Sequence, residues 1–534
     1  MREEGFFPSK ADSCVWMREK NGVYEYVATY VDDLACAMHD ANGFLKKLTE
    51  HYKFKLKGVG PISFHLGCDF TRDPDGTLVM QPKKFIEKMI GSYERLFGEK
   101  PKECNSPLPK GDHPELDDTE LCNEKDKAIY MSLIGSLQWL ITLGRYDISC
   151  AVASMSRFRP APRKGHLERA KRIYGYVKKF KDAAIRFRTG EPDYSELPTK
   201  TYDWMYSVYG NVEEQVPSDA PKPLGKPVVT SSYYDANLMH CLVTGRAMTG
   251  VMHFVNQTLI DTYSKRQATV ATATFGSEFV AAKQCTEQVI ELRNSLRYLG
   301  VPIKTTSYVF GDNQSVVTQS TLPHSQLAKR MYALAYHRVR EAVAAGIIAM
   351  HHVPGKINPS DVLTKFLGYQ EAWHLVQPIL HWRGDTATLQ TKGSDSAKLR
   401  ENNPMHIARV LSVAKQSQIK EKPRVVITAV TNGKFIRAKN DDVIGARKVS
   451  HERVTTTRTV KNLDGFTSID SRHVEIKPTS TRSVLINTND QSQSKTILES
   501  NQRRTSINAE AIAADPHQVK TTKIGATIKA HNSK

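Results

Sequence analysis

The stretch PVVTSSYYDAN, residues 227–237, decides the fold of the second half of the chain. Its β-branched and aromatic residues predict a strand that ends in Asp235. The stretch TTSYVFGDNQS, residues 305–315, has the same character and predicts a strand that ends in Asp312. Two predicted strands of this region therefore each end in an aspartate.

Helical patterns lie between and after these strands. The run SEFVAAKQCTEQVIELRNSLRYLG predicts one long amphipathic helix that begins at Ser277 and carries Glu278 in its first turn. The stretch AGIIAMHHVPGKINPSDVLTKFL, residues 345–367, predicts a strand, a Pro/Gly loop and a helix opened by Ser360 and Asp361. Strands that alternate with helices indicate an α/β region.

Four acids, Asp235, Glu278, Asp312 and Asp361, thus lie at the ends of elements that could converge at one edge of a single sheet. Clustered carboxylates repel one another, and a divalent cation relieves that repulsion. Two Mg²⁺ ions about 3.5–4 Å apart, or Mn²⁺ in their place, would activate a water and stabilise the leaving oxygen in phosphodiester cleavage. Each acid alone is equally consistent with a helix N-terminus or a turn, so the prediction rests on their order.

The motifs of this region resemble the ribonuclease H domain of Ty1/copia-type retrotransposon Pol polyproteins. The matching segments are YYDAN with TGRAMTGVMHFVN, SKRQATVATATFGSEFVAA, FGDNQSVV, YHRVREAV and HVPGKINPSDVLTKFLG. The resemblance implies a mixed sheet with flanking helices, in which Asp235, Glu278, Asp312 and Asp361 bind the catalytic metal ions.

The match departs from the family in one loop. Many ribonucleases H place a mobile His just before the last acid, and PGKINPS contains none. His351 and His352 come earlier, and we expect them to be partly buried strand residues.

The first half of the chain contains two hairpin patterns. VYEYVATYVDDLACAM at 23–38 places Asp32 and Asp33 at a hairpin tip, and residues 61–81 predict a second hairpin with its turn at 73–76. The YVDD tip resembles the palm hairpin of reverse transcriptases. FHLGCDF resembles the primer-grip hairpin that follows it.

Further segments extend this resemblance on both sides of the hairpins. GFFPSKADSCVW resembles the segment that precedes the palm hairpin. Helical patterns at 83–97, 126–143 and 163–181 follow, and two segments there, YMSLIGSLQWLITLGRYDISCAVASMSRF and HLERAKRIYGYVKKF, resemble the thumb and connection. The resemblance implies a truncated palm, because only 29 residues precede Tyr30 and none of their acids lies in a strand-Asp pattern. We therefore expect no polymerase activity from this chain alone.

Charge is distributed unevenly. Lys and Arg number 75 against 56 Asp and Glu, which gives a net charge of +19, and residues 391–534 carry 26 basic and 13 acidic residues, or +13 of this total. That segment has no Trp or Tyr, so we expect a mostly disordered basic tail that binds phosphates. The alternative is a folded third domain, since segments such as PRVVITAV could form strands.

The composition indicates a nucleic-acid partner, and RNA–DNA hybrid is the one that the resemblance implies. Two basic groups are candidates for phosphate contact, although a solvated charged face is an equally good interpretation. They comprise Lys171, Arg172 and Lys178 on one helical stretch and Lys329, Arg330 and Arg338 near the four acids.

Location is predicted from what the sequence lacks. No apolar run of about 18 residues predicts a membrane span, and the first ten residues contain no signal-peptide pattern. The eight cysteines form no metal-binding spacing, and we interpret them as reduced thiols of an intracellular protein, cytoplasmic or nuclear.

The predicted organisation has five parts. They are a truncated palm (1–110), a thumb and connection region (111–215), a Pro- and Lys-rich linker (216–227), a ribonuclease H-like domain (228–385) and the basic tail (386–534).

The leading hypothesis is a reverse transcriptase/ribonuclease H fragment of a copia-type Pol polyprotein that hydrolyses the RNA strand of hybrids. Other Pol segments are further candidate partners. The alternatives are a non-catalytic nucleic-acid-binding remnant and a decayed product that does not fold stably.

Overall fold

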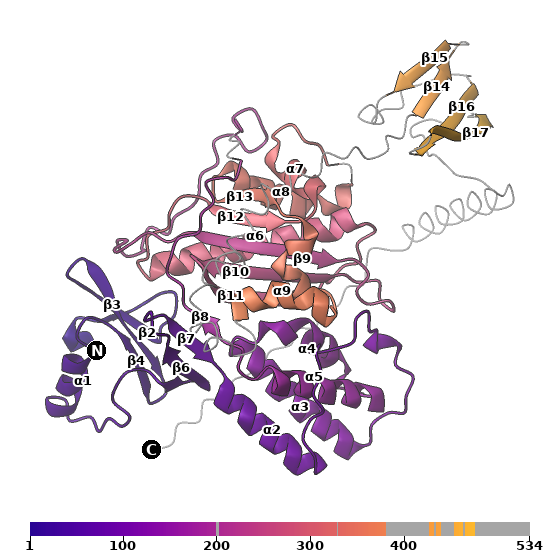
Figure 1. Ribbon diagram of the computed structural model, residues 1–534. Coiled ribbons are helices and arrows are strands. Elements are labelled where there is room, and N and C mark those ends of the chain that lie inside the picture. The colour runs from indigo at the N-terminus through magenta and orange to yellow at the C-terminus, as the bar shows by residue number, and fades with distance from the viewer. Residues whose placement is uncertain are drawn as a thin grey trace, which may run out of the picture. The chain divides into compact units, whose positions relative to one another are not determined.

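The computed structural model describes residues 1–198, 202–327 and 329–380 and, further on, the backbone of four strands between 427 and 475 (Figure 1). The described residues fall into two units, one that ends at Leu380 and one made of these four strands. Each unit is treated by itself below. Within the described residues, no helix is both long enough and apolar enough to cross a membrane.

A five-stranded mixed sheet forms the centre of the first unit. Its strands are β9 (Thr230–Asn237), β10 (Met248–Val255), β11 (Thr258–Arg266), β12 (Ser307–Gly311) and β13 (Ile348–His352). Their order in the sheet is β11-β10-β9-β12-β13. Strands β9, β12 and β13 run parallel, while β10 is antiparallel to both of its neighbours. The α/β prediction for this region is confirmed.

One face of this sheet is covered by α6 (Thr274–Tyr298) and α8 (Ala333–Ala344). Tyr234 on β9 and Val309 on β12 belong there to the same buried hydrophobic cluster as Phe279 and Val289 of α6. The predicted long helix from Ser277 is therefore confirmed and begins three residues earlier. The short helix α7 (Gln314–Thr321) follows β12.

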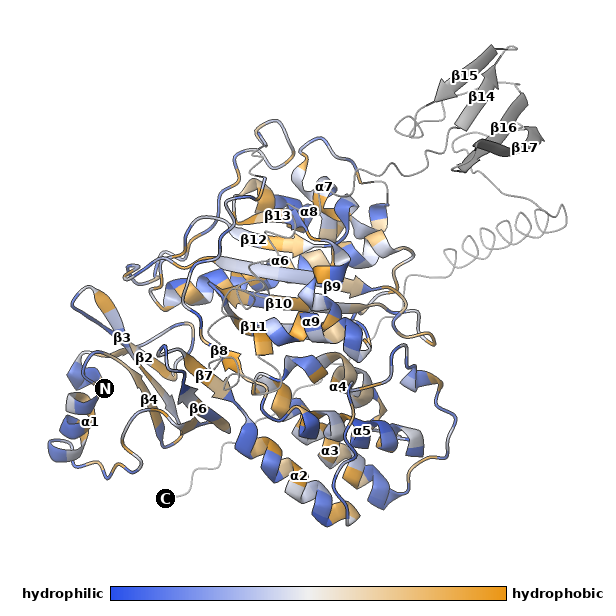
Figure 2. Cartoon of the chain, viewed as in Figure 1, coloured by the Kyte–Doolittle hydropathy of each residue, from blue (hydrophilic) through white to orange (hydrophobic). Residues whose placement is uncertain are grey.

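The opposite face of the sheet shares a hydrophobic core with four helices from the first half of the chain and with α9. The helices of this layer are α2 (Lys83–Phe97), α3 (Glu124–Thr142), α4 (Ser149–Met155), α5 (Lys164–Lys179) and α9 (Tyr369–Leu380). Figure 2 shows apolar and polar residues together along α2, as expected for an amphipathic helix that buries one stripe. The three helices predicted at 83–97, 126–143 and 163–181 are confirmed.

A single hydrophobic core joins these helices to the sheet. Met155 of α4 and Ile173 of α5 belong to the same buried cluster as Met252 of β10, Phe310 of β12 and Leu363. The predicted boundary at 216–227 thus separates residues of one core, and the domain limits remain a prediction. Within 216–227, the Leu224 N–H donates to the Gly300 carbonyl at 2.9 Å.

The N-terminal residues form two small antiparallel sheets. The first contains β1 (Phe7–Pro8), β2 (Val15–Lys20), β3 (Val23–Tyr30) and β4 (Asp33–Ala37), and α1 (Ala41–Glu50) packs on it. The second contains β5 (Phe64–His65), β6 (Cys68–Arg72), β7 (Leu78–Gln81) and β8 (Ile185–Arg186). Both predicted hairpins are confirmed.

The second unit is an antiparallel sheet in the order β15-β14-β16-β17. Its strands are β14 (Ile427–Thr431), β15 (Lys434–Ala438), β16 (Arg453–Asn462) and β17 (Gly465–Glu475). At these positions the structure differs from the irregular tail that we expected, because runs rich in Val, Ile and Thr favour strands. The other residues of 381–534, which include parts of the predicted domain 228–385 and of the basic tail, lie outside the described residues.

Candidate active site

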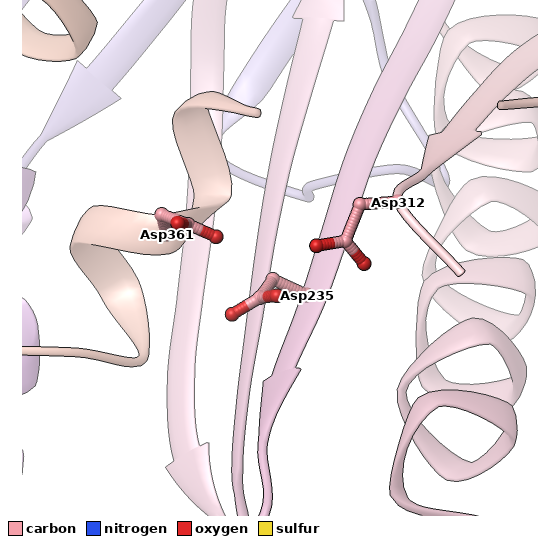
Figure 3. Close-up of side chains that lie close together, drawn as sticks. All are labelled: Asp235, Asp312 and Asp361. Carbon is pink, nitrogen blue, oxygen red and sulfur yellow. The ribbon is translucent and has the colours of Figure 1, made fainter. Parts of the chain in front are cut away.

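Three aspartates meet at one edge of the central sheet (Figure 3). Asp235 lies in β9 and Asp312 directly follows the neighbouring parallel strand β12, so both reach the same sheet edge. Asp361 belongs to the 3-10 helix η7 (Pro359–Leu363). One carboxylate oxygen of each lies within 4.8 Å of those of the other two. The prediction that these acids converge holds for these three residues.

The segment that carries Asp361 is fixed to the sheet by side-chain hydrogen bonds. Asn358 caps η7, because its Oδ1 accepts from the Ser360 N–H at 3.1 Å. The Nδ2 of Asn358 donates to the Tyr234 carbonyl on β9 at 2.9 Å, next to Asp235. This amide therefore sets the position of Asp361 relative to Asp235.

A glycine allows this close approach. Gly250 on β10 pairs in register with Asp235, and η7 packs over β10. A Cβ atom at Gly250 would lie 2.7 Å from the Cβ of Leu363, too close for an ordinary contact. The absence of a side chain at this position lets η7 lie flat on the sheet.

Glu278, the fourth predicted acid, is buried in the first part of α6 and lies outside the group of three. Burial, followed by repulsion from Asp235 and Asp312, raises the pKa of Glu278 well above its usual value. Its Oε2 is buried and has no hydrogen-bond partner among the described residues. A buried carboxylate oxygen without a partner is the kind of group that a bound cation satisfies.

Burial and repulsion also raise the pKa values of Asp312 and Asp361. Desolvation, followed by the charge of Asp235, raises the pKa of Asp312 to about 6 and the pKa of Asp361 to about 7. Without a cation these carboxyls therefore keep protons up to nearly neutral pH. The all-oxygen donor set, with the unpartnered Oε2 of Glu278, fits a hard divalent cation such as Mg²⁺.

Sequence reasoning missed two residues that touch the cluster. Lys365 Nζ lies 2.8 Å from Asp361 Oδ1 and 3.4 Å from Asp235 Oδ1. The hydroxyl of the buried Thr364 donates to Asp235 Oδ2. The (i, i+4) spacing of Asp361 and Lys365 was visible in the sequence, but it points to an ordinary surface ion pair.

The two histidines of β13 are strand residues as predicted. His351 is buried and its ring stacks on Tyr308. His352 is half-buried, and its Nε2 lies 3.0 Å from the carbonyl oxygen of Asp312.

Some of the residues predicted to contact phosphate already make contacts within the chain, and others are exposed. Lys171 pairs with Glu168 at 2.7 Å, Arg172 donates to the Ser106 hydroxyl, Lys178 donates to the Pro101 carbonyl, and Arg338 pairs with Glu341. These four side chains are committed to contacts within the chain.

Lys329 and Arg330, in contrast, are exposed. They lie at and just before η5 (Arg330–Tyr332), whose Tyr332 hydroxyl accepts from the Thr272 N–H, just before α6 and Glu278. These two residues are therefore the better candidates for phosphate contact.

The acids of the YVDD tip lie apart from the cluster. Tyr30 pairs with Asp33 across the β3–β4 hairpin, and Asp32 and Asp33 are both exposed. Among the described residues, the group of three acidic side chains that could hold a metal ion consists of Asp235, Asp312 and Asp361, without either acid of the tip.

The chain is similar in sequence to proteins encoded by transposons of plants and yeast. The chain is 25% identical over 376 residues to the retrovirus-related Pol polyprotein from transposon TNT 1-94 of Nicotiana tabacum, a match that covers 68% of this chain and 25% of that protein. It is 22% identical over 364 residues to the corresponding polyprotein from transposon RE1 of Arabidopsis thaliana, covering 68% of this chain and 22% of that protein. The putative transposon Ty5-1 protein YCL074W of Saccharomyces cerevisiae is 28% identical over 195 residues, covering 36% of this chain and 60% of that protein.

The chain thus spans about a quarter of the length of the two plant polyproteins that it matches. No protein-family model matches it. Among solved structures, ribonuclease H1 from the halophilic archaeon Halobacterium salinarum is 17% identical, with 27% of this chain and 96% of that chain covered and a TM-score of 0.21. LC11-RNase H1, solved in complex with RNA/DNA hybrid, is 14% identical, with 25% and 93% covered and a TM-score of 0.21.

Proposed function

From the similarity of this chain to the Pol polyproteins of plant and yeast Ty/copia-type transposons, we propose that it is a retroelement nuclease of the ribonuclease H type. Its reaction is the metal-dependent hydrolysis of the RNA strand of an RNA–DNA hybrid, and Mg²⁺ is the expected ion. The observation that carries this proposal is the convergence of Asp235, Asp312 and Asp361 at one sheet edge.

The acidic side chains hold the metal ions in this proposal. Divalent ions bound there would supply an activated water and neutralise charge on the scissile phosphate. Asp235 and Asp312 are fixed by neighbouring strands, and the hydrogen bonds of Asn358 fix the segment that carries Asp361, so little reorganisation is needed at these ligands. Glu278, whose buried Oε2 has no hydrogen-bond partner among the described residues, would be the fourth ligand and would bind the cation as the carboxylate.

Substrate contact is assigned to the exposed basic residues near α6. Lys329 and Arg330 would neutralise phosphates of the hybrid, since both side chains are exposed, whereas Arg338 pairs with Glu341. Their substitution by Ala would weaken hybrid binding and make it less dependent on salt.

Cleavage of a labelled hybrid tests the nuclease assignment. The intact chain should cut the RNA strand in Mg²⁺ and leave 3′-hydroxyl and 5′-phosphate ends, and it should be inactive in EDTA. Asp312→Asn should abolish cleavage with little change in hybrid binding. The assay uses the whole chain, because the helices α3–α5 and the central sheet share one hydrophobic core.

A non-catalytic nucleic-acid-binding protein is the second candidate, favoured by the +19 net charge. The same assay separates the two functions. A chain that binds hybrid tightly but does not cleave it in Mg²⁺ or Mn²⁺ would be this second kind of protein.

We further propose that the chain on its own does not polymerise DNA. Polymerase chemistry needs a third carboxylate in the palm, and among the described residues no group of three possible metal-holding side chains includes Asp32 or Asp33 of the β3–β4 tip. Primer extension on an RNA template should be undetectable. Extension that disappears in Asp32→Asn would refute this proposal.

A further inference from the structure

The side chain of Lys365 places a positive charge beside the acidic cluster. Lys365 Nζ lies 2.8 Å from Asp361 Oδ1 and 3.4 Å from Asp235 Oδ1, and its side chain is 32% exposed. The ammonium group thus contacts two of the three aspartates from which the proposed metal site is built. At these distances a divalent cation on the same two carboxylates would be repelled strongly.

Residues 364 and 365 together engage both carboxylate oxygens of Asp235. Oδ1 faces the Lys365 ammonium group, and Oδ2 accepts from the Thr364 hydroxyl. Asp235 is almost fully buried, so water cannot replace these contacts easily. A metal ion that takes Asp235 as a ligand must therefore weaken its interaction with Lys365.

The chain offers the ammonium group another location. Besides contacting the acids, Lys365 lines a cavity together with the polar residues Asn105, Ser106 and Asp147 and the apolar Leu108 and Phe366. The four-carbon stem of Lys365 can move while its backbone stays in place. Displacement of the ammonium group therefore does not require η7 to leave the sheet.

We propose that Lys365 is a tethered counter-cation that stabilises the Asp235–Asp361 pair without metal and competes with Mg²⁺ for it. This inference rests on the proposed metal site and adds a determinant of its metal affinity. It predicts that a neutral residue at position 365 makes the metal-free protein less stable and its Mg²⁺ binding tighter.

Thermal unfolding of the intact chain, titrated with MgCl₂ at pH 7.5, tests this. In Lys365→Met and Lys365→Gln, the Mg²⁺ concentration at the midpoint of the stabilisation should fall by about tenfold or more. Lys365→Arg keeps the charge and should bind Mg²⁺ much as the parent does. The matched control is Lys283→Met, which removes an (i, i+4) ion pair with Glu287 (3.1 Å) on α6 and should leave the midpoint unchanged.

An unchanged or higher midpoint in both neutral variants would overturn the inference. If neither neutral variant folds without metal, restoration of folding by Mg²⁺ supports it and failure to restore folding overturns it. The nuclease proposal fails in a different measurement, the cleavage of hybrid by the parent protein, so the two failures are distinguishable.

Discussion

Replacing Asp312 by Asn should make the metal-free protein more stable and at the same time abolish the proposed nuclease activity. Asp312 directly follows β12 and lies with Asp235 and Asp361 in a partly buried cluster. Asn keeps the size of the side chain and removes one negative charge. The same substitution therefore relieves repulsion in the absence of metal and removes a ligand in its presence.

The magnitude follows from the pKa of Asp312. Burial and the charge of Asp235 raise this pKa from 3.8 to about 6, and one pKa unit corresponds to about 1.4 kcal/mol. At pH 7.5 the ionised carboxylate thus destabilises the folded protein by at most about 3 kcal/mol relative to an unperturbed aspartate.

The sign of the pH dependence is fixed by the same shift. The folded protein binds this proton more tightly than the unfolded chain does. Its contribution therefore favours the folded state at low pH and is lost as the pH rises from about 4 through 6. In Asp312→Asn this part of the pH dependence should disappear, while the part due to Asp361 should remain at a somewhat lower pH, because the charge of Asp312 contributes to the raised pKa of Asp361.

Urea unfolding in EDTA across pH 4–8 measures this contribution for both proteins. We expect the free energy of unfolding of Asp312→Asn to exceed that of the parent by about 2 kcal/mol at pH 7.5 and to match it near pH 4. With Mg²⁺ added, the parent should gain stability and the variant should gain much less. A variant that is less stable than the parent in EDTA at pH 7.5 would refute the electrostatic reasoning, and one that cleaves hybrid at the parental rate would refute the ligand assignment.

Three further substitutions or deletions probe other parts of the molecule. Gly250→Ala forces η7 away from β10 and should reduce cleavage more than tenfold with a loss of about 1–3 kcal/mol in urea unfolding, whereas Gly91→Ala, which meets no atom within 4 Å, should be nearly neutral in both. Arg145→Met leaves Asp147 buried without its partner and should cost about 3–5 kcal/mol of unfolding free energy; retention of parental stability would contradict a structural role of this ion pair. Removal of residues 391–534, which carry +13, should make the salt dependence of hybrid binding shallower in a filter-binding assay and leave cleavage at saturating substrate unchanged; an unaltered salt slope would argue against phosphate contact by this segment.

Local sequence patterns were sufficient to predict the strands that carry or precede Asp235 and Asp312. Each strand is a short run of β-branched and aromatic residues, and the pattern of α6 is long enough to be recognised as a helix. The prediction was wrong in detail for Asp361. It was expected to open a helix, but η7 is a five-residue 3-10 helix and the next α-helix, α9, begins at Tyr369. Pro359 and the side-chain cap from Asn358 fit a short turn of helix equally well.

Lys365 and Thr364 could not be recognised from the sequence because their roles depend on tertiary packing. Both reach Asp235, about 130 positions earlier in the chain, only because η7 lies across β9 and β10. A run of basic residues likewise does not show which side chains have partners within the chain. The structure shows such partners for Lys171, Arg172 and Lys178. A charge pattern predicts which side chains could reach solvent, but not which ones the fold has already paired.

The helices of the first half of the chain bear directly on the geometry of the candidate site. Leu363 of η7 is buried in the same cluster as Ala151 of α4 and Ile148, and η7 contacts both α4 and the short helix η3 (Tyr146–Ile148). Asp361 is therefore held from the sheet side by Asn358 and Gly250, and from the other side by helices outside the predicted nuclease domain. A shift of α4 would be transmitted to Asp361, because close-packed cores move as contiguous blocks rather than deforming locally. It follows that the geometry of the candidate site depends on residues outside the predicted nuclease domain, because α4 and η3 contact the short helix that carries Asp361.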